Sequence, residues 1–373
     1  MKFNQNITEI TFDDVLLLPG KSDFLVDNEK KVVNITGRVT KDLFLELPII
    51  SAPMPGITTA AMAIALGKAG GMSVIHPFQS IKSQAEQIRI VKEANVKVAG
   101  SISFNKNTTL KDVEILLKAG ADLISIETGH AHNQQTIEFI SKIKNTFEKI
   151  RLSASLVVTG EATEALIKAG ADNIRVGIGG GSHCTTRLVT GVGRPQLSAI
   201  EECYKVAKKY DIPIISDTGI KYSGDLPKAF AFGAETVMIG GLLAGTDECP
   251  GEIVEKEGKK YKYSWGMCTD TAYKHKTPFE KLKPEYILQL IKKTIKKIIG
   301  RADSDSFREK DFEEGVEALV PYRGPVTSIL NQLRGGLIRS MWYLGTKNIK
   351  EIAKKTRVVM VSNSTPLENI PRI

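Results

Sequence analysis

Short apolar runs alternate with amphipathic helical stretches along most of this chain, and this alternation constrains the fold more than any other feature. Eight runs occur, each about as long as a strand buried on both faces. They lie at Pro48–Ala52, Met72–His76, Val98–Phe104, Leu123–Thr128, Ala154–Val158, Ile174–Ile178, Pro213–Asp217 and Thr236–Gly240. Between them, apolar residues recur at helical spacing. Continuous apolar strands separated by helices predict a parallel sheet that is covered on both sides.

The predicted helices share a signal at their ends. Gly120, Gly170 and Gly233 each stand just after a helical stretch and just before an apolar run. Glycine accepts the left-handed conformation with which many helices close. Eight such units over roughly 200 residues predict an α/β fold of the (β/α)8, or TIM-barrel, type. A doubly wound sheet is the alternative, but it rarely contains so many similar units in succession.

One glycine-rich stretch, Gly177–Arg187, combines an open backbone with nucleophilic and hydroxyl side chains. It follows an apolar run and contains Ser182, the thiol of Cys184, and Thr186. Glycines leave backbone amides uncovered, and uncovered amides bind anions such as phosphate. A cysteine at the end of this cradle can act as a thiolate nucleophile. A tight turn with a buried thiol is the simpler alternative.

The candidate site consists of the polar and glycine residues that end the apolar runs, because the active site of a (β/α)8 barrel lies at the carboxyl ends of its strands. Outside the glycine-rich stretch these residues are Ser51, Met54, His76, Glu127, Asp217, Gly219, Gly240 and Gly241. Asp217 directly follows its run and can accept hydrogen bonds from ligand hydroxyls. It can equally cap the next turn.

Composition indicates a globular chain with a large core. The 373 residues are 42% apolar and 25% charged, so we expect a single barrel domain over residues 1–373. No run approaches the ~20 apolar residues of a membrane span, and the first residues lack a signal-peptide pattern. The four cysteines show no metal-ligand spacing and are interpreted as free thiols. We therefore expect a cytoplasmic protein without a membrane partner.

Much of the net charge of +9 comes from a lysine-rich stretch between Lys274 and Lys297. Its apolar residues follow helical spacing, which predicts an amphipathic helix with a solvated lysine face. It has neither stacking aromatics nor a recognisable nucleic-acid module, so we expect no nucleic-acid partner. The polar residues from Arg301 to Glu314 indicate a mobile flap. Together these segments form a predicted insertion at about 274–314.

Three segments predict secondary structure outside the barrel. Gly251–Tyr263 has the pattern of a charged hairpin. Pro325–Leu333 predicts a helix that precedes Gly335-Gly336, and Asn348–Lys355 predicts the last helix.

Several longer motifs occur in order from one end of the chain to the other. They are Thr11–Pro19, Ser51–Met54, Val176–Arg187, Gly191–Leu197, Asp217–Asp225, Gly240–Glu252, Gly266-Met267 and Glu314–Gly324. Together they resemble the IMP dehydrogenase/GMP reductase family, far more specifically than a glycine loop alone. The family fold is a (β/α)8 barrel, in agreement with the strand count. The resemblance is to a short form without the CBS regulatory domain pair. That pair is normally inserted after the second barrel helix, and the stretch between Val91 and Val98 is too short to contain it.

The resemblance implies chemistry at carbon 2 of a purine nucleotide, either GMP or IMP. A nicotinamide cofactor, NADP or NAD, exchanges hydride with the purine. Cys184 matches the residue that attacks the purine carbon and forms a covalent adduct, while Thr186 and Glu314 match groups implicated in proton transfer. A thiol suits the first role because it is strongly nucleophilic and partly ionised near neutrality. The family also implies a homotetramer.

The resemblance further assigns binding positions. The nucleotide would contact Ser51, Met54, Ser182, Asp217, Gly219, Gly240, Gly241, Gly266 and Met267. Within this set, Asp217 matches the carboxylate that binds the ribose hydroxyls. Glu127 stands where the family usually places an aspartate that faces the nicotinamide ribose. The carbonyls of Gly179, Gly181 and Cys184 correspond to a potassium site in the dehydrogenases.

Three points favour GMP reductase, which converts GMP and NADPH to IMP, ammonia and NADP. The sequence of the predicted flap, Gly300–Arg308, lacks the Arg-Tyr pair with which dehydrogenases activate water. Gly240-Gly241 replaces their usual Gly-Ser, and the regulatory insertion is missing. IMP dehydrogenase, which converts IMP, NAD and water to XMP and NADH, is the alternative. Glu313–Glu317 and Pro321–Gly324 resemble that branch more closely.

Several departures from the family pattern line the predicted pocket. Pro55 replaces an aspartate, Ser153–Ser155 replaces Ala-Gly-Asn, and Thr218 replaces a glycine. They leave a non-catalytic purine-nucleotide-binding relative as a further alternative. His183 replaces a small apolar residue beside the nucleophile. It is either a cation that lowers the pKa of the thiol or, as we favour, a histidine exposed on the loop or packed on a neighbouring subunit. His76 either contacts the ligand or is a satisfied buried histidine.

Overall fold

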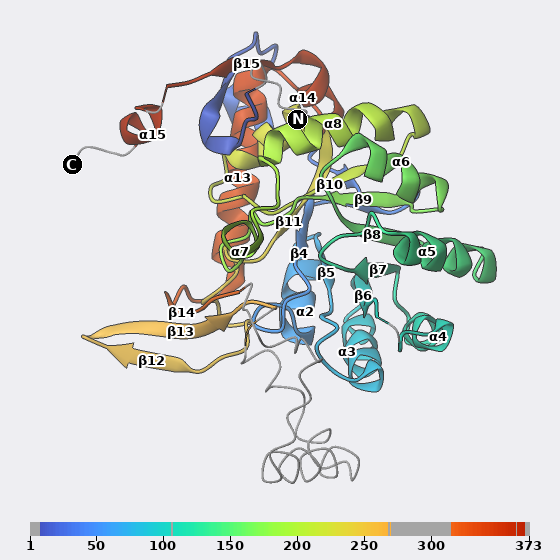
Figure 1. Cartoon of the computed structure of the whole chain (residues 1–373). Helices are drawn as coiled ribbons and strands as arrows, with labels where there is room; N and C mark the ends of the chain where they lie inside the picture. The colour runs from blue at the N-terminus through green and yellow to red at the C-terminus, as the bar shows by residue number, and fades with distance from the viewer. Residues whose placement is uncertain (1–7, 106, 268, 270–314, 363, 370–373) are drawn as a thin grey trace.

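Eight parallel strands form a closed barrel (Figure 1). The computed structural model describes residues 8–105, 107–267, 269, 315–362 and 364–369. The barrel strands are β4 (Ile49–Ser51), β5 (Met72–Val74), β6 (Val98–Ser103), β7 (Leu123–Glu127), β8 (Leu152–Val157), β9 (Asn173–Val176), β10 (Ile214–Asp217) and β11 (Ala234–Ile239). β11 pairs in parallel with β4 and closes the ring. The predicted TIM barrel is confirmed, and the doubly wound alternative is wrong because the sheet has no edge.

Helices between the strands surround the barrel (Figure 1). They are α2 (Ala60–Lys68), α3 (Ile81–Glu93), α4 (Leu110–Lys118), α5 (Gln134–Thr146), α6 (Gly160–Lys168), α8 (Gln196–Ala207) and α9 (Asp225–Ala231), with η3 (Lys208–Tyr210) after α8. The short α7 (Thr186–Thr190) belongs to the loop after β9 and buries no residue. Several of these helices have an N-cap residue whose side chain accepts a hydrogen bond from an amide of the first turn. In α3, for example, the Ser80 side chain accepts from the Ser83 amide. Gly120, Gly170 and Gly233 have φ values of +99°, +107° and +110°, so the predicted helix-closing role of these glycines is confirmed.

The amino end of the barrel is closed by a short hairpin, β2 (Gly37–Arg38) with β3 (Phe44–Leu45). Its buried apolar side chains, Val39, Leu43 and Leu45, pack against residues at the starts of the barrel strands, such as Met72 and Leu123. A second and larger apolar cluster lies between the strands and the surrounding helices. Because the hairpin fills one end, the polar residues at the carboxyl ends of the strands are the ones that remain available for a site.

The predicted hairpin at 251–263 is confirmed as β12 (Ile253–Lys256) and β13 (Lys259–Trp265). A third strand that the sequence did not predict, β14 (Glu317–Pro321), pairs antiparallel with β13. This three-stranded sheet projects from the side of the barrel (Figure 1). Elsewhere β1 (Val15–Leu18) pairs with β15 (Arg357–Met360). The remaining short elements are η1 (Phe12–Asp14), η2 (Val26–Asn28), α1 (Glu29–Val32) and α15 (Thr365–Glu368).

The helix predicted at Pro325–Leu333 is longer than the sequence indicated. It runs as α13 from Val326 to Leu344 and includes both glycines that were expected to follow it. A Cβ on Gly336 would lie 2.5 Å from the Cβ and Oγ of Ser223. At this position glycine therefore permits close helix packing instead of ending the helix. The last predicted helix is confirmed as α14 (Ile349–Lys355).

The lysine-rich helix and the flap predicted at about 274–314 lie outside the described residues, as does Glu314. Within the part that is described, no helix is long and apolar enough to cross a membrane.

Candidate active site

Three loops at the carboxyl ends of β9, β10 and β11 meet so closely that only glycine fits at their contacts. A Cβ on Gly177 would lie 1.9 Å from the Asp217 carbonyl oxygen. A Cβ on Gly241 would lie 2.1 Å from Ser182 Oγ. Gly177 also has φ +146°, a conformation that L side chains rarely adopt. The glycines of the predicted phosphate cradle therefore bring the loops together as well as exposing their amides.

This junction contains backbone amides without acceptors. The amides of Ser182, Gly219 and Gly241 donate no hydrogen bond to any other described residue. One of these amides comes from each of the three loops. Backbone amides that donate to no protein group can bind anions. The arrangement suits an anion such as a phosphate group.

Cys184 lies next to these amides and is partly exposed. Its Sγ is 3.1 Å from Thr186 Oγ1, and its amide donates to the Gly181 carbonyl at 3.1 Å. Its backbone also forms an isolated antiparallel β-bridge with Gly315, the first described residue after the predicted flap. Two other thiols are buried, and burial raises the pKa of Cys203 to about 12 and also raises the pKa of Cys249. Among the described thiols, Cys184 is therefore the one available for chemistry with a ligand.

A buried arginine that the sequence analysis did not single out connects two predicted site residues. Arg175 Nη2 lies 2.7 Å from Asp217 Oδ2, and Nη1 forms an ion pair with Glu127. Nη1 also donates to Ser125 Oγ at 2.9 Å. Burial lowers the pKa of Arg175, but the two carboxylates outweigh burial and raise it above its usual value. An arginine inside the apolar run Ile174–Ile178 was the signal that could have found it.

Asp217 and Glu127 are both buried, and each keeps one oxygen with unused acceptor capacity. Burial raises the pKa of Asp217, although Arg175 opposes this shift. Within the described residues, Asp217 Oδ1 receives no hydrogen bond, so it can accept from ligand hydroxyls. Glu127 Oε1 accepts from Ser125 Oγ at 2.6 Å, whereas Oε2 has only a 3.5 Å contact with Ser155 Oγ. Asp217 Oδ1 and Glu127 Oε2 can therefore accept hydrogen bonds from a ligand.

His183 is buried, with 8% of its surface exposed, so the favoured prediction of an exposed loop histidine is wrong. Nδ1 is 3.1 Å from Ser182 Oγ, and Nε2 is 3.0 Å from Ser264 Oγ. Burial lowers the pKa of His183 below its usual value. The imidazole is therefore neutral near pH 7, and the alternative of a cation beside the thiol is also unsupported.

His76 is buried at the end of β5, and burial lowers its pKa to about 4. Its Nε2 is 3.5 Å from Gln79 Nε2. Its Nδ1 has no partner among the described residues, so it is not fully satisfied.

The remaining predicted nucleotide-binding residues surround the same junction at different depths. Ser51 is fully buried and its Oγ is hydrogen-bonded to the hydroxyls of Ser73 and Thr58, which places it beneath the surface of the site. The Met54 sulfur lies 2.9 Å from the position of a Cβ on Gly240. Gly266 packs against His183, because a Cβ there would be 3.2 Å from the His183 Cβ. Met267 follows and is half-buried.

The three carbonyls predicted to bind potassium belong to one turn. Gly179 has φ +73°, and the Gly181 carbonyl keeps a second lone pair beside its bond from the Cys184 amide. Oxygen donors of this kind fit a hard cation. The turn supplies three carbonyl oxygens, so such an ion would need further ligands. No group of three or more His, Cys, Asp or Glu side chains in the described part of the chain could hold a metal ion.

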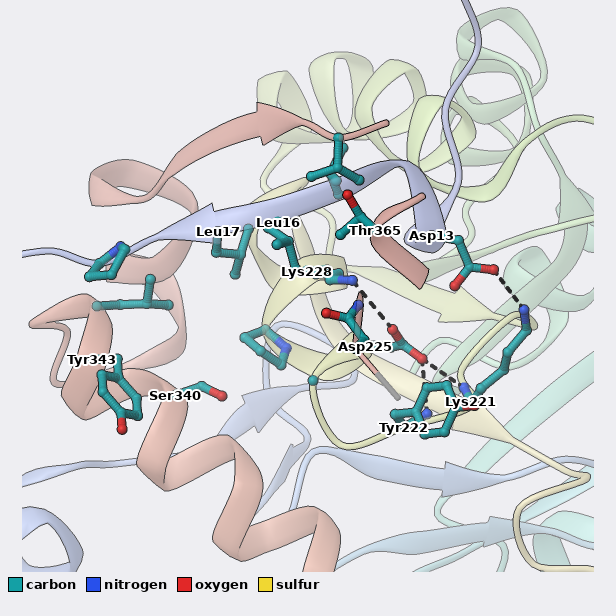
Figure 2. A pocket seen from close by; sticks show the side chains of 17 residues that line it. Asp13, Leu16, Leu17, Lys221, Tyr222, Asp225, Lys228, Ser340, Tyr343 and Thr365 are labelled. Atoms are coloured by element: carbon teal, nitrogen blue, oxygen red, sulfur yellow. Dashed lines mark hydrogen bonds and ion pairs between the residues drawn. The ribbon is translucent and has the colours of Figure 1, made fainter. Parts of the chain in front are cut away.

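A cavity of about 790 Å³ lies apart from this junction, between β1, the loop before α9, and α13 (Figure 2). Lys221 and Asp225 line it together with apolar residues of β1. The Asp225 carboxylate accepts from the amides of Lys221 and Tyr222, and Lys221 Nζ pairs with Asp13 at 2.8 Å (Figure 2). The predicted site residues do not line this cavity.

The fold and the site define a (β/α)8-barrel protein with a partly exposed thiol beside a junction of free backbone amides. A family profile described as "IMP dehydrogenase / GMP reductase domain" matches residues 9–372. The chain is 35% identical to the inosine-5'-monophosphate dehydrogenase of Borreliella burgdorferi, over 97% of this chain and 96% of that protein. It is 34% identical to the Cryptosporidium parvum protein of the same name, over 95% and 92%, and 33% identical to the Methanocaldococcus jannaschii one, over 97% and 94%.

The chain therefore belongs to the IMP dehydrogenase/GMP reductase family, as its motifs indicated. It is a nicotinamide-dependent oxidoreductase of purine metabolism.

Proposed function

We propose that this protein is an IMP dehydrogenase, which oxidises IMP at carbon 2 with NAD and water to give XMP and NADH. The main observation in support of a nucleotide substrate is that the partly exposed Cys184 thiol lies next to the free amides of Ser182, Gly219 and Gly241. The names of the relatives support the dehydrogenase direction. They favour it over the GMP reductase that the sequence alone suggested.

The junction orients the nucleotide by its two polar ends. The free amides would hold the 5′-phosphate, since amides of this kind bind anions. Asp217 Oδ1 would accept hydrogen bonds from the ribose hydroxyls while Arg175 fixes Oδ2 at 2.7 Å. With its phosphate and its ribose both held, the nucleotide would present its purine to the thiol, and the attack would become effectively unimolecular.

Cys184 Sγ would attack carbon 2 of the purine and form a sulfur–carbon bond. The nicotinamide, when bound, supplies the acceptor for the hydride that leaves carbon 2. Water then adds at carbon 2, the sulfur–carbon bond breaks, and XMP leaves with the new oxygen. Thr186 Oγ1, 3.1 Å from the thiol, is placed to hold or pass a proton at Sγ. Glu314 is proposed for the same proton transfer on its family position.

Two further ligands follow from the same proposal. Glu127 Oε2 keeps the capacity to accept from the nicotinamide ribose. A potassium ion would contact the carbonyls of Gly179, Gly181 and Cys184. The assembly proposed from the family is a homotetramer, which light scattering would measure.

GMP reductase remains the second candidate because of two observations in the sequence. Gly300–Arg308 lacks an Arg-Tyr pair, and Gly240-Gly241 matches the reductase pattern. One experiment separates the two functions: purified protein is incubated with IMP and NAD, and separately with GMP and NADPH.

The absorbance of reduced nicotinamide and the nucleotide products are followed in both incubations. NADH and XMP from the first mixture support the proposal. NADPH consumption with IMP and ammonia from the second establishes the reductase instead. Nucleotide binding without turnover in either mixture indicates the non-catalytic alternative.

A further inference from the structure

His183 connects two hydroxyl groups across the edge of the candidate site. Its Nδ1 faces Ser182 Oγ at 3.1 Å and its Nε2 faces Ser264 Oγ at 3.0 Å. All but 8% of the histidine surface is buried, and burial favours the neutral ring. A neutral imidazole has one N–H donor and one acceptor nitrogen. The two hydrogen bonds of the series Ser264–His183–Ser182 therefore run in the same direction, either towards Ser182 or towards Ser264. The bound ligand decides which of the two directions is adopted.

A phosphate group sets that direction because its oxygens at neutral pH mainly accept hydrogen bonds. Ser182 is the hydroxyl at the junction of free amides, within 2.1 Å of the position of a Cβ on Gly241. To stabilise a phosphate its O–H must donate to the ligand. The Ser182 oxygen then accepts from His183 Nδ1–H, and Nε2 accepts from the Ser264 hydroxyl.

We propose that His183 is a positioning residue for the phosphate of the nucleotide. With the phosphate bound it is the Nδ1–H tautomer, its Nε2 accepts from Ser264, and the Ser182 hydroxyl points at the ligand. The inference rests on the proposed function, since it needs a phosphate-bearing substrate at this junction. His183 itself touches no reacting atom. It acts through the Ser182 hydroxyl.

The strand that carries Ser264 is firmly anchored, so Ser264 is a fixed partner for His183 Nε2. Ser264 is 1% exposed and lies in β13. Two positions earlier on the same strand, the buried Lys262 ammonium donates to the carbonyls of Thr246 at 2.8 Å and Cys249 at 2.6 Å. These carbonyls belong to the segment that follows β11 and Gly241. β13 is thus tied to the same part of the chain that contributes an amide to the junction.

Val316, the residue just before β14, fixes the histidine backbone as well. The Val316 amide donates to the His183 carbonyl at 3.0 Å, and the Gly266 amide donates to the Val316 carbonyl at 3.3 Å. The backbone of His183 is therefore held in place, and the burial of its side chain leaves the ring little room to turn. A rigid imidazole between two hydroxyls preorganises the Ser182 donor before the ligand arrives.

Matched substitutions separate this role from simple packing. His183→Asn places an amide near the Nδ1 position and keeps a donor for Ser182, whereas His183→Gln places it near Nε2 and leaves Ser182 without one. Ser264→Ala removes the hydroxyl that donates to Nε2, and Ser182→Ala serves as the positive control. Circular dichroism and thermal unfolding show that each variant is folded. Calorimetry then measures the dissociation constants of IMP and of inosine, which lacks the phosphate.

We expect His183→Gln and Ser182→Ala to weaken IMP binding about 10- to 100-fold, the usual effect of losing one hydrogen bond to a charged group. Ser264→Ala should weaken it less, and His183→Asn should remain within about 2-fold of wild type. Inosine affinity should not change in any of them.

Two results overturn this inference while leaving the proposed function intact: His183→Gln binding IMP as tightly as wild type, or IMP and inosine affinities falling by the same factor. Wild-type protein that does not bind IMP overturns the proposed function, and the inference falls with it.

Discussion

Replacing Arg175 with methionine should destabilise the protein strongly and in a pH-dependent way. Methionine has similar length and no charge, so the change leaves the buried Glu127 and Asp217 carboxylates without their shared cation. Removing one partner of a buried ion pair typically costs about 3–5 kcal/mol. A chain of 373 residues has an unfolding entropy of about 0.8 kcal/mol/K. The expected fall in melting temperature is therefore about 4–6 °C at neutral pH.

The sign of the pH dependence follows from the carboxyl groups. Burial already raises the pKa of Asp217, and Arg175 opposes that shift. Without the arginine the folded-state pKa rises further above the unfolded value, so the folded variant binds more protons than the unfolded chain. Its stability then falls as pH rises through that interval. The deficit against wild type should be largest near pH 8 and should shrink towards pH 5.

Differential scanning calorimetry at one protein concentration and scan rate measures this deficit. The matched control is Arg151→Met, which removes a surface ion pair whose partner Asp42 has a 64% exposed side chain. Such pairs contribute at most about 1 kcal/mol, so the control should lose about 1 °C. Adding Glu127→Gln and Asp217→Asn to Arg175→Met should recover part of the loss. A deficit no larger than that of the control, or one that grows at acid pH, would refute the account of this cluster.

The other predictions concern glycine packing and thiol chemistry. Gly335→Ala, where an added Cβ meets nothing within 4 Å, should stabilise α13 by about 0.5–1 kcal/mol in denaturant unfolding, whereas Gly336→Ala should destabilise the protein because its Cβ would meet Ser223 at 2.5 Å. Equal effects of the two changes would contradict the packing argument. Iodoacetamide should alkylate Cys184 well before Cys203, whose pKa is raised to about 12 by burial, and peptide mapping checks the order. IMP should slow that alkylation if its purine covers the thiol; unchanged rates would contradict that placement.

Most of the fold could be predicted from the sequence, because strand and helix periodicities report burial directly. All eight apolar runs became barrel strands, and glycines such as Gly120 marked the helix ends. The predicted end of α13 was wrong because Gly336 is required by close packing against Ser223, which is more than 100 positions away in the chain. A local pattern carries no information about such a contact. β14 was missed for the same reason, since its partner β13 is distant in sequence.

The site was predicted less completely than the fold. The loops around Cys184, Asp217 and Gly241 do come together, as strand ends in a barrel must. Arg175 was overlooked because its strand otherwise reads as an apolar run, and its two carboxylate partners come from other strands. The burial of His183 was also not predictable, since it depends on Ser264 in the projecting sheet.

Trapping the covalent adduct tests the central claim most directly. Protein mixed with IMP and NAD is quenched in acid during turnover, digested, and examined by mass spectrometry. The account predicts a purine-nucleotide adduct on the peptide that contains Cys184, none on the peptides of Cys203 or Cys249, and neither adduct nor turnover in Cys184→Ser, which should still bind IMP. Turnover that persists in Cys184→Ser, or an adduct on another residue, would contradict it.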